Sequence, residues 1–238
     1  MSHTLMHASK LGAQTWLLAI FLIVANPKGR SSVQLAADLG VTQKTAWHLA
    51  HRIRQALAEG GLPGFDGPVE ADETYIGGKA RNRHAHKADP GKTAVIGVKD
   101  RRTGTVAATP VHEVTTATAT AMVAATTRQG AEVYTDGSRI YDPLAAMGFN
   151  HARVIHGLGE YVRGSVSTNG VENYWSLLKR THIGTYHYMS DDHLHRYIEE
   201  HSFRYNRRNR HVIDKMSEAA AAMEGRSLTY RELTGSRG

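Results

Sequence analysis

Hydrophobic residues recur with a helical period through roughly the first 60 positions. The run from Trp16 to Ala25 is apolar and uncharged, but a bilayer span needs roughly 20 such residues. The run therefore predicts a buried helix. A secretory signal peptide is the alternative, because Lys10 precedes an apolar run of suitable length. We favour the buried helix because the next thirty residues predict a basic helical module against which it can pack.

Two shorter helices are predicted after this run, separated by a turn at Gly40. Ser31 or Ser32 can cap the first helix, which ends near Leu39, and Thr42 can cap the second, which runs to about Leu57. Residues at the expected crossing and core positions are small or apolar, namely Ala36, Gly40, Ala46, Leu35, Leu39, Val41, Leu49 and Ile53. This pattern is typical of a helix-turn-helix, whose second helix enters the major groove of DNA.

The exposed side of the second helix is predicted to be polar and basic, with Gln43, Lys44, His48, Arg52 and Arg54. An ordinary helical hairpin with a solvated face is the alternative. The basic side chains favour DNA binding, and we expect Lys44, His48 and Arg52 to make the contacts.

The period changes after the Gly- and Pro-rich stretch at 60–68, which indicates a linker. Strands are predicted at 69–76, 93–98, 105–111, 131–135 and 152–155, with helical segments at 116–128 and 138–147 and a helix opening at Ser167 or Thr168. Three antiparallel strands followed by right-handed strand–helix–strand units give a mixed five-stranded sheet with helices on both faces, an α/β fold. In this order the first and fourth strands are central neighbours.

Three carboxylates are candidates for chemistry at this sheet. Asp72 lies within the first strand, and Asp136 lies where the fourth strand ends. The final helix, in STNGVENYWSLLKR, could bring Glu172 alongside them. Clustered carboxylates repel each other, and hard divalent cations such as Mg²⁺ relieve that repulsion. A pair of such ions can catalyse in-line displacement at phosphorus. The alternative, three unrelated surface acids, remains open on spacing alone.

The charge balance points to an anionic partner. The chain carries 29 Lys and Arg against 22 Asp and Glu, a net charge of +7, and nucleic acid is the commonest partner of such proteins. The absence of cysteine excludes disulfides, thiol catalysis and Cys-type zinc sites, and it fits a reducing compartment. Basic residues that could grip phosphates, if they are not simply a solvated face, are Lys179, Arg180, Arg204, Arg207 and Arg208.

Four ordered blocks carry a family resemblance: VEADETYIGGK, VYTDGSRIYDPL, GEYVRGSVSTNGVENYWSLLKRTHIGTYHYMS and HLHRYIEEHSFRYNRR. They resemble the bacterial insertion-sequence transposases of the ISXO-like type. The resemblance implies a DDE transposase with a ribonuclease H-like catalytic domain, whose acidic residues fall on Asp72, Asp136 and Glu172. Some accounts of the group give the third role to an Asn, here Asn169. Glu172 is the better ligand because an amide cannot neutralise a cation, whereas Asn169 can orient substrate or water.

The resemblance also implies an activity and its requirements. Such an enzyme binds terminal inverted repeats in double-stranded DNA, uses two Mg²⁺ ions (with Mn²⁺ as a substitute), frees 3′-hydroxyls and transfers them to target DNA. Two ends must be brought together, so we expect a homodimer or higher assembly on DNA, in the bacterial cytoplasm at the nucleoid, with no membrane partner. The expected domains are a helix-turn-helix module at 1–62 and the catalytic domain with a basic helical C-terminal part at 66–238.

Two departures from the family pattern bear on activity. Such proteins often begin with a Cys-rich zinc ribbon, whereas this chain has no cysteine, and Ser167 stands where the family often has His. The alternative function is therefore a catalytically inactive or domesticated helix-turn-helix regulator. The intact acidic set argues against it, because a DNA-binding protein has no need of carboxylates clustered next to phosphates.

Overall fold

The computed structural model describes residues 3–58, 64–77, 91–154 and 167–235, which form two compact units. The sheet unit comprises residues 60–182 and 188–198, and the helical unit comprises residues 1–59, 183–187 and 199–238. Each unit has a hydrophobic core of its own.

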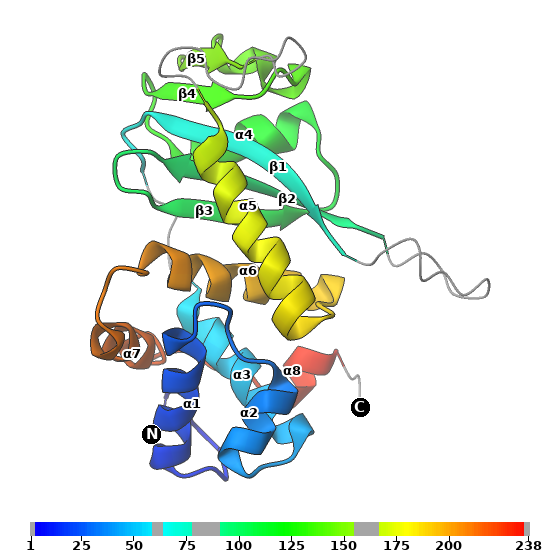
Figure 1. The fold of residues 1–238 in the computed structure, drawn as a ribbon, viewed down its shortest axis with the longest axis vertical. Coiled ribbons are helices and arrows are strands. Elements are labelled where there is room, and N and C mark those ends of the chain that lie inside the picture. Colours follow the sequence, from blue (N-terminus) through cyan, green and yellow to red (C-terminus); the bar gives the residue numbers. More distant parts are fainter. Residues whose placement is uncertain (1–2, 59–63, 78–90, 155–166, 236–238) are drawn as a thin grey trace, which may run out of the picture. The chain divides into compact units, whose positions relative to one another are not determined.

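The sheet unit contains five strands in the order β3-β2-β1-β4-β5 (Figure 1). Its described elements are β1 (Val69–Ile76), β2 (Thr93–Asp100), β3 (Val106–Val111), α4 (Thr116–Thr126), β4 (Glu132–Thr135), the 3₁₀ helix η2 (Arg139–Leu144), β5 (Asn150–Arg153), α5 (Asn169–Thr181) and the first half of α6 (Asp191–Asn206). The β1–β2 and β2–β3 pairs are antiparallel, whereas β1–β4 and β4–β5 are parallel. This confirms the predicted mixed sheet of ribonuclease H-like type, with β1 and β4 adjacent.

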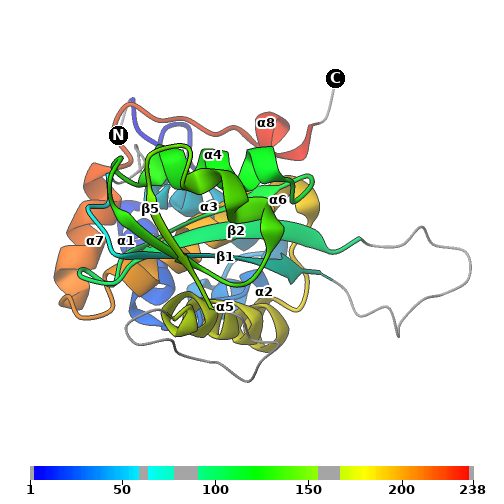
Figure 2. The same ribbon diagram turned by 90° about the horizontal axis from the view of Figure 1, so that it is seen from above.

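Helices α4 and α5 lie on opposite faces of this sheet (Figure 2). Val69 and Ala71 of β1 belong to the buried cluster that contains Ala119 and Val123 of α4. Because successive side chains of a strand point to opposite faces, the even-numbered residues of β1 point to the face that α5 covers. The sheet thereby presents Glu70, Asp72 and Thr74 to α5.

Two local predictions differ from the structure in detail. The fifth strand begins at Asn150 rather than at 152, because Asn150 already pairs with Glu132 of β4; the predicted last residue, at 155, lies outside the described residues. The segment 138–147 forms a six-residue 3₁₀ helix that contains Pro143. Proline removes a backbone donor, which disfavours a longer α-helix. Residues 60–63 of the predicted linker also lie outside the described residues.

The helical unit combines the N-terminal helices with the C-terminal part of the chain. Its elements are α1 (Ala13–Ala25), α2 (Ser32–Leu39), α3 (Gln43–Leu57), the second half of α6 (Asp191–Asn206), α7 (Val212–Ala221) and α8 (Tyr230–Thr234). The short π-helix η4 (His182–Tyr186) follows α5. Trp16, Ile20 and Ile23 of α1 are buried, as predicted, in one core with Phe203 and Leu228. This shared core groups residues from 199 onward with the N-terminal helices, whereas the sequence-based division placed them with the sheet.

The two helices around Gly40 begin at the predicted caps. The Ser31 hydroxyl accepts the Gln34 N–H at 3.2 Å, and the Thr42 hydroxyl accepts the Thr45 N–H at 3.2 Å. Gly40 adopts a left-handed conformation with φ of 64°, which costs glycine little. Within the described part of the chain, no helix has the length and apolar character to cross a membrane.

Candidate active site

The pairing of β1 with β4 brings two of the predicted acidic residues near each other. Val69 pairs with Val133 and Glu70 with Tyr134; Asp72 follows two residues later on β1, and Asp136 follows directly after the end of β4. Asp72 lies on the face covered by α5, and Asp136 lies beyond the last paired residues of the two strands. Burial raises the pKa of Asp72 to about 7, and the charges of Glu73 and Asp136 contribute to the rise. The charge of Asp136 thus acts on the carboxyl group of Asp72.

Trp175 of α5 holds the carboxylate of Asp72. Its indole N–H donates to Asp72 Oδ2 at 3.0 Å. The ring lies over Gly97 of β2, where an added Cβ would come within 2.6 Å of it. This bond was not predicted from the sequence. The available signal was that a buried indole N–H normally finds an acceptor.

Glu70 anchors the start of α5, a role that the sequence analysis also missed. Its carboxylate is 3% exposed and accepts the Val171 N–H at 2.8 Å, with the Arg101 guanidinium at 3.2 Å. Gly170 permits this approach, because a Cβ there would lie 2.6 Å from both Glu70 and Lys99 Nζ. An anion at a helix N-terminus is favoured by unpaired N–H groups and the helix dipole. The sequence signal for this role was the spacing of Glu70 and Asp72, two carboxylates two residues apart on one central strand.

Helix α5 begins directly after Thr168, as predicted, but the hydroxyl of this residue does not cap it. Thr168 occupies the N-cap position but makes no cap hydrogen bond; its hydroxyl instead donates to Glu172 Oε1 at 2.8 Å. The buried carboxylate of Glu70 serves the helix end instead, because it reaches the Val171 N–H from β1.

Glu172 is exposed and lies one turn before Trp175 on the same side of α5. Asn169, also exposed, is the first residue of the helix. Among the described residues, no three histidine or acidic side chains are close enough to hold a metal ion. The arrangement therefore brings Asp72 and Asp136 together and leaves Glu172 outside a three-ligand cluster. A partly buried, mutually repelling pair of carboxylates nevertheless fits a hard divalent cation, which prefers such oxygen ligands.

Two of the predicted DNA-contacting cations extend from α5. Lys179 and Arg180 are exposed, and Lys179 follows Glu172 by seven residues, about two helical turns along the same side. The Arg180 guanidinium donates to the backbone oxygen and the hydroxyl of Ser176 at 3.3 and 3.1 Å. Both charges remain at the solvent surface of the sheet unit.

Arg52 and Arg54 of α3 are buried, so the prediction that they lie on an exposed basic face is wrong. Arg52 is 8% exposed; its guanidinium donates to the His7 carbonyl at 2.6 Å and stacks 5.2 Å from the Trp16 ring. Arg54 forms an ion pair with Glu200 at 2.5 Å. Both cations are held by partners that are distant in the sequence.

Arg204 is also buried, which contradicts its prediction as a phosphate contact. It is 4% exposed and forms an ion pair with Glu200, one helical turn earlier on α6. Of its predicted companions, Arg207 is bound to Glu218, whereas Arg208 is exposed beside the ring of Tyr205. The exposed Arg208 guanidinium also donates to the Tyr205 carbonyl at 2.8 Å.

The C-terminal helix α8 covers part of α3. The Tyr230 ring lies 4.7 Å from the Lys44 ammonium and 5.4 Å from the His48 imidazole. Burial lowers the pKa of His48, and the charge of Arg52 lowers it further. Lys44 is exposed and His48 half-buried, so Tyr230 shares the surface that was predicted to face DNA.

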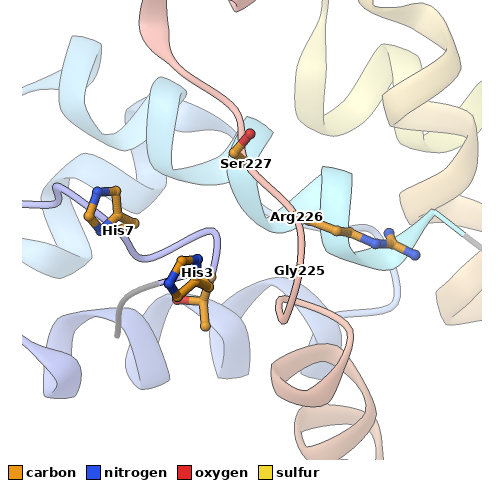
Figure 3. Close-up of a pocket in the computed structure, with 6 residues that line it drawn as sticks. His3, His7, Gly225, Arg226 and Ser227 are labelled. Atoms are coloured by element: carbon orange, nitrogen blue, oxygen red, sulfur yellow. The ribbon is translucent and has the colours of Figure 1, made fainter.

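A cavity of about 370 Å³ in the helical unit is lined by His3, His7 and Arg226, among others. Figure 3 shows the Arg226 side chain directed away from the two imidazoles. Its guanidinium donates to the carbonyls of Gln55 and Ala58, at 2.5 and 3.1 Å, and so caps the end of α3. The charge of Arg226 is thus committed to the end of α3 and not to the cavity.

Comparisons with known proteins extend these observations. Residues 64–206 match the family model described as the ISXO2-like transposase domain. A curated relative, described as an uncharacterized protein in transposable element ISH50 of Halobacterium salinarum, is 32% identical over 192 residues, which cover 74% of this chain and 64% of that protein. A chain from the cryo-EM structure of the simian T-cell lymphotropic virus intasome in complex with PP2A regulatory subunit B56 gamma matches with a TM-score of 0.37 and 16% identity, over 71% of this chain and 63% of that one. This chain thus spans less than two thirds of either relative.

Proposed function

We propose that this chain, which belongs to the ISXO2-like transposase family, cleaves DNA at the ends of a mobile element and joins the freed 3′-hydroxyls to target DNA. The observation that carries the proposal is that Asp136, directly after β4, lies within electrostatic reach of Asp72 of β1, which faces the helix that presents Glu172. The raised pKa of Asp72 supports it, because perturbed carboxylates concentrate at catalytic sites.

The chain's own residues supply position and charge. Asp72 and Asp136 would hold Mg²⁺ or Mn²⁺, with Glu172 as a third carboxylate; the metal would polarise the phosphodiester and activate the attacking oxygen. The indole of Trp175 fixes the orientation of the Asp72 carboxylate. Glu70 fixes the start of α5, and with it the position of Glu172.

Cations on both units support DNA as the substrate. Lys179 and Arg180 extend along α5 from Glu172, where they would bind phosphates near the cut. Lys44, His48 and Arg208 are the members of the predicted set that keep exposed or half-exposed basic groups in the helical unit. We further propose that α3 binds the terminal inverted repeats in the manner of a helix-turn-helix, and that two copies act together on paired ends.

The first test replaces Asp136 by Asn. Cleavage of linear DNA carrying the element's ends in Mg²⁺ should fall at least about a hundredfold, because a carboxylate ligand contributes several kcal/mol to metal-assisted catalysis. DNA binding in a mobility-shift assay should remain. The matched control is Asp142→Asn, which removes an exposed carboxylate paired with Arg153 and should cleave like wild type.

The outcomes separate the competing functions. Wild-type binding without cleavage in Mg²⁺ or Mn²⁺ would favour the inactive regulator. Cleavage without joining to target DNA would indicate a nuclease. Wild-type cleavage by Asp136→Asn would remove Asp136 from the site.

The third carboxylate can be assigned by comparing Glu172→Gln with Asn169→Ala. Glu172→Gln should lose cleavage as severely as Asp136→Asn, because it removes a charge that opposes the metal. Asn169→Ala should lose less, about tenfold, the cost of one orienting hydrogen bond. The reverse order would give the third ligand role to Asn169.

Tyr230→Ala should strengthen DNA binding. The substitution uncovers the Lys44 ammonium, and a cation–π contact at an exposed site is worth about 0.5–1 kcal/mol, or roughly two- to fivefold in affinity. The measurement is a fluorescence-anisotropy titration at fixed low salt. Tyr230→Phe keeps the ring over Lys44 and should bind like wild type. Weaker binding by Tyr230→Ala would instead place the ring among the DNA contacts.

A further inference from the structure

Glu73 follows the first candidate metal ligand directly, yet it serves the opposite face of the sheet. As an odd-numbered residue of β1 it points away from α5, and its Oε2 accepts the Tyr141 hydroxyl at 2.9 Å. Tyr141 is fully buried in the core that packs under α4. A buried hydroxyl held by a carboxylate fixes the position of both groups.

Tyr141 belongs to the segment that carries the second candidate ligand. It lies five residues after Asp136, in η2. Between them, Asp136 Oδ1 accepts the Ser138 N–H at 3.0 Å, which folds the segment into a compact turn. Asp136 and Tyr141 are therefore the two ends of one short structural element.

This segment lies beyond the β1–β4 ladder. The recorded pairs of β1 with β4 end at Glu70 and Tyr134 in the described residues, two residues before Asp72 and Asp136. The repulsion between these two carboxylates acts where that ladder no longer ties the two strands. The Tyr141–Glu73 hydrogen bond spans this gap, because Glu73 adjoins Asp72 in β1.

We propose that Tyr141 and Glu73 form a clamp that sets the spacing of Asp72 and Asp136 for a divalent cation. The inference rests on the proposed function and adds two positioning residues to it. Mg²⁺ tolerates little departure from octahedral geometry, so a fixed spacing lowers the cost of assembling its ligands. The clamp works from the far face of the sheet and leaves the face under α5 open.

The test removes one oxygen with Tyr141→Phe. Mn²⁺ binding by isothermal titration calorimetry, without DNA, should weaken about tenfold, since the hydrogen bond being lost joins a hydroxyl to a charged group. The metal concentration for half-maximal DNA cleavage should rise by the same factor, while the rate at saturating metal stays within about twofold. The matched control is Tyr134→Phe, which loses a 2.5 Å hydrogen bond to Glu132 on β4 and should bind Mn²⁺ like wild type.

A double-variant cycle distinguishes the clamp from a direct ligand role for Glu73. If Tyr141 and Glu73 act only through their hydrogen bond, the double variant Tyr141→Phe/Glu73→Ala should have the same Mn²⁺ affinity as the single variant that binds Mn²⁺ less tightly. Additive losses would overturn the clamp and make Glu73 a ligand. Unchanged Mn²⁺ affinity in a folded Tyr141→Phe protein would also overturn it. Failure of the wild type to bind Mn²⁺ and to cleave DNA would instead count against the proposed function.

Discussion

Asp72→Asn is expected to abolish DNA cleavage and, in the absence of metal, to stabilise the protein. Burial raises the pKa of Asp72 to about 7, so ionising this carboxyl in the folded state costs free energy. A rise from an ordinary value near 4 corresponds to roughly 2–4 kcal/mol, when allowance is made for partial hydration. Asn carries no charge and still offers an oxygen to the Trp175 indole.

The stability gained by Asp72→Asn should depend on pH. The folded state holds the Asp72 proton more tightly than the unfolded chain, so this group's contribution to stability is full below about pH 4 and is lost as the pH rises to about 7. Asp72→Asn should therefore match wild type near pH 4 and exceed it at pH 8. Urea unfolding at both values, with EDTA present, measures this difference.

A divalent metal ion should make the wild type more stable than Asp72→Asn, the reverse of the order expected without metal. Mg²⁺ that binds the folded wild type stabilises it by mass action, whereas the variant lacks a ligand and should respond little. Asp142→Asn, at an exposed ion pair, should shift by less than about 1 kcal/mol at any pH. An Asp72→Asn protein less stable than wild type at pH 8 without metal would contradict the raised pKa. A stabilised variant that has lost cleavage is the result expected where function requires a strained site.

The sequence predicts the sheet well because its signals are local. The strands predicted at 69–76 and 131–135 locate Asp72 and Asp136, and the strand order then makes β1 and β4 neighbours. The roles of Glu70 and Trp175 escape this reasoning. Each depends on a partner about one hundred residues away, across the contact of α5 with β1, and no periodicity within either element specifies that contact.

The basic residues of α3 show the same limit of prediction from sequence more clearly. Lys44 and Arg52 are both basic residues of α3, yet Lys44 is exposed and Arg52 is buried against the N-terminal segment. A helical period assigns a residue to a face, but whether another segment covers that face is decided by tertiary packing. Arginine is also well suited to burial, because its planar guanidinium stacks and donates in several directions.

The largest stability effect is expected at Glu200, which is fully buried between two arginines. It forms ion pairs with Arg54 and Arg204 and accepts a hydrogen bond from Tyr186. Burial alone would raise the pKa of Glu200, but the charges of Arg204 and Arg54 hold it below its ordinary value. Glu200→Gln keeps the shape and leaves two buried guanidinium groups without a counter-charge, which should cost about 3–5 kcal/mol.

Glu218 provides the matched comparison, since it also joins two arginines but lies at the surface. Its partners are Arg207 and Arg210, and its side chain is 32% exposed. Glu218→Gln should therefore cost at most about 1 kcal/mol. Hydrogen exchange of the α3 and α6 amides reports each loss directly. Equal losses of stability in Glu200→Gln and Glu218→Gln would mean that burial of the charges does not determine how much these two ion-pair clusters contribute to stability. A large loss at Glu200 alone would show that Arg54 and Arg204 stabilise the fold of the helical unit and are not held in reserve for DNA.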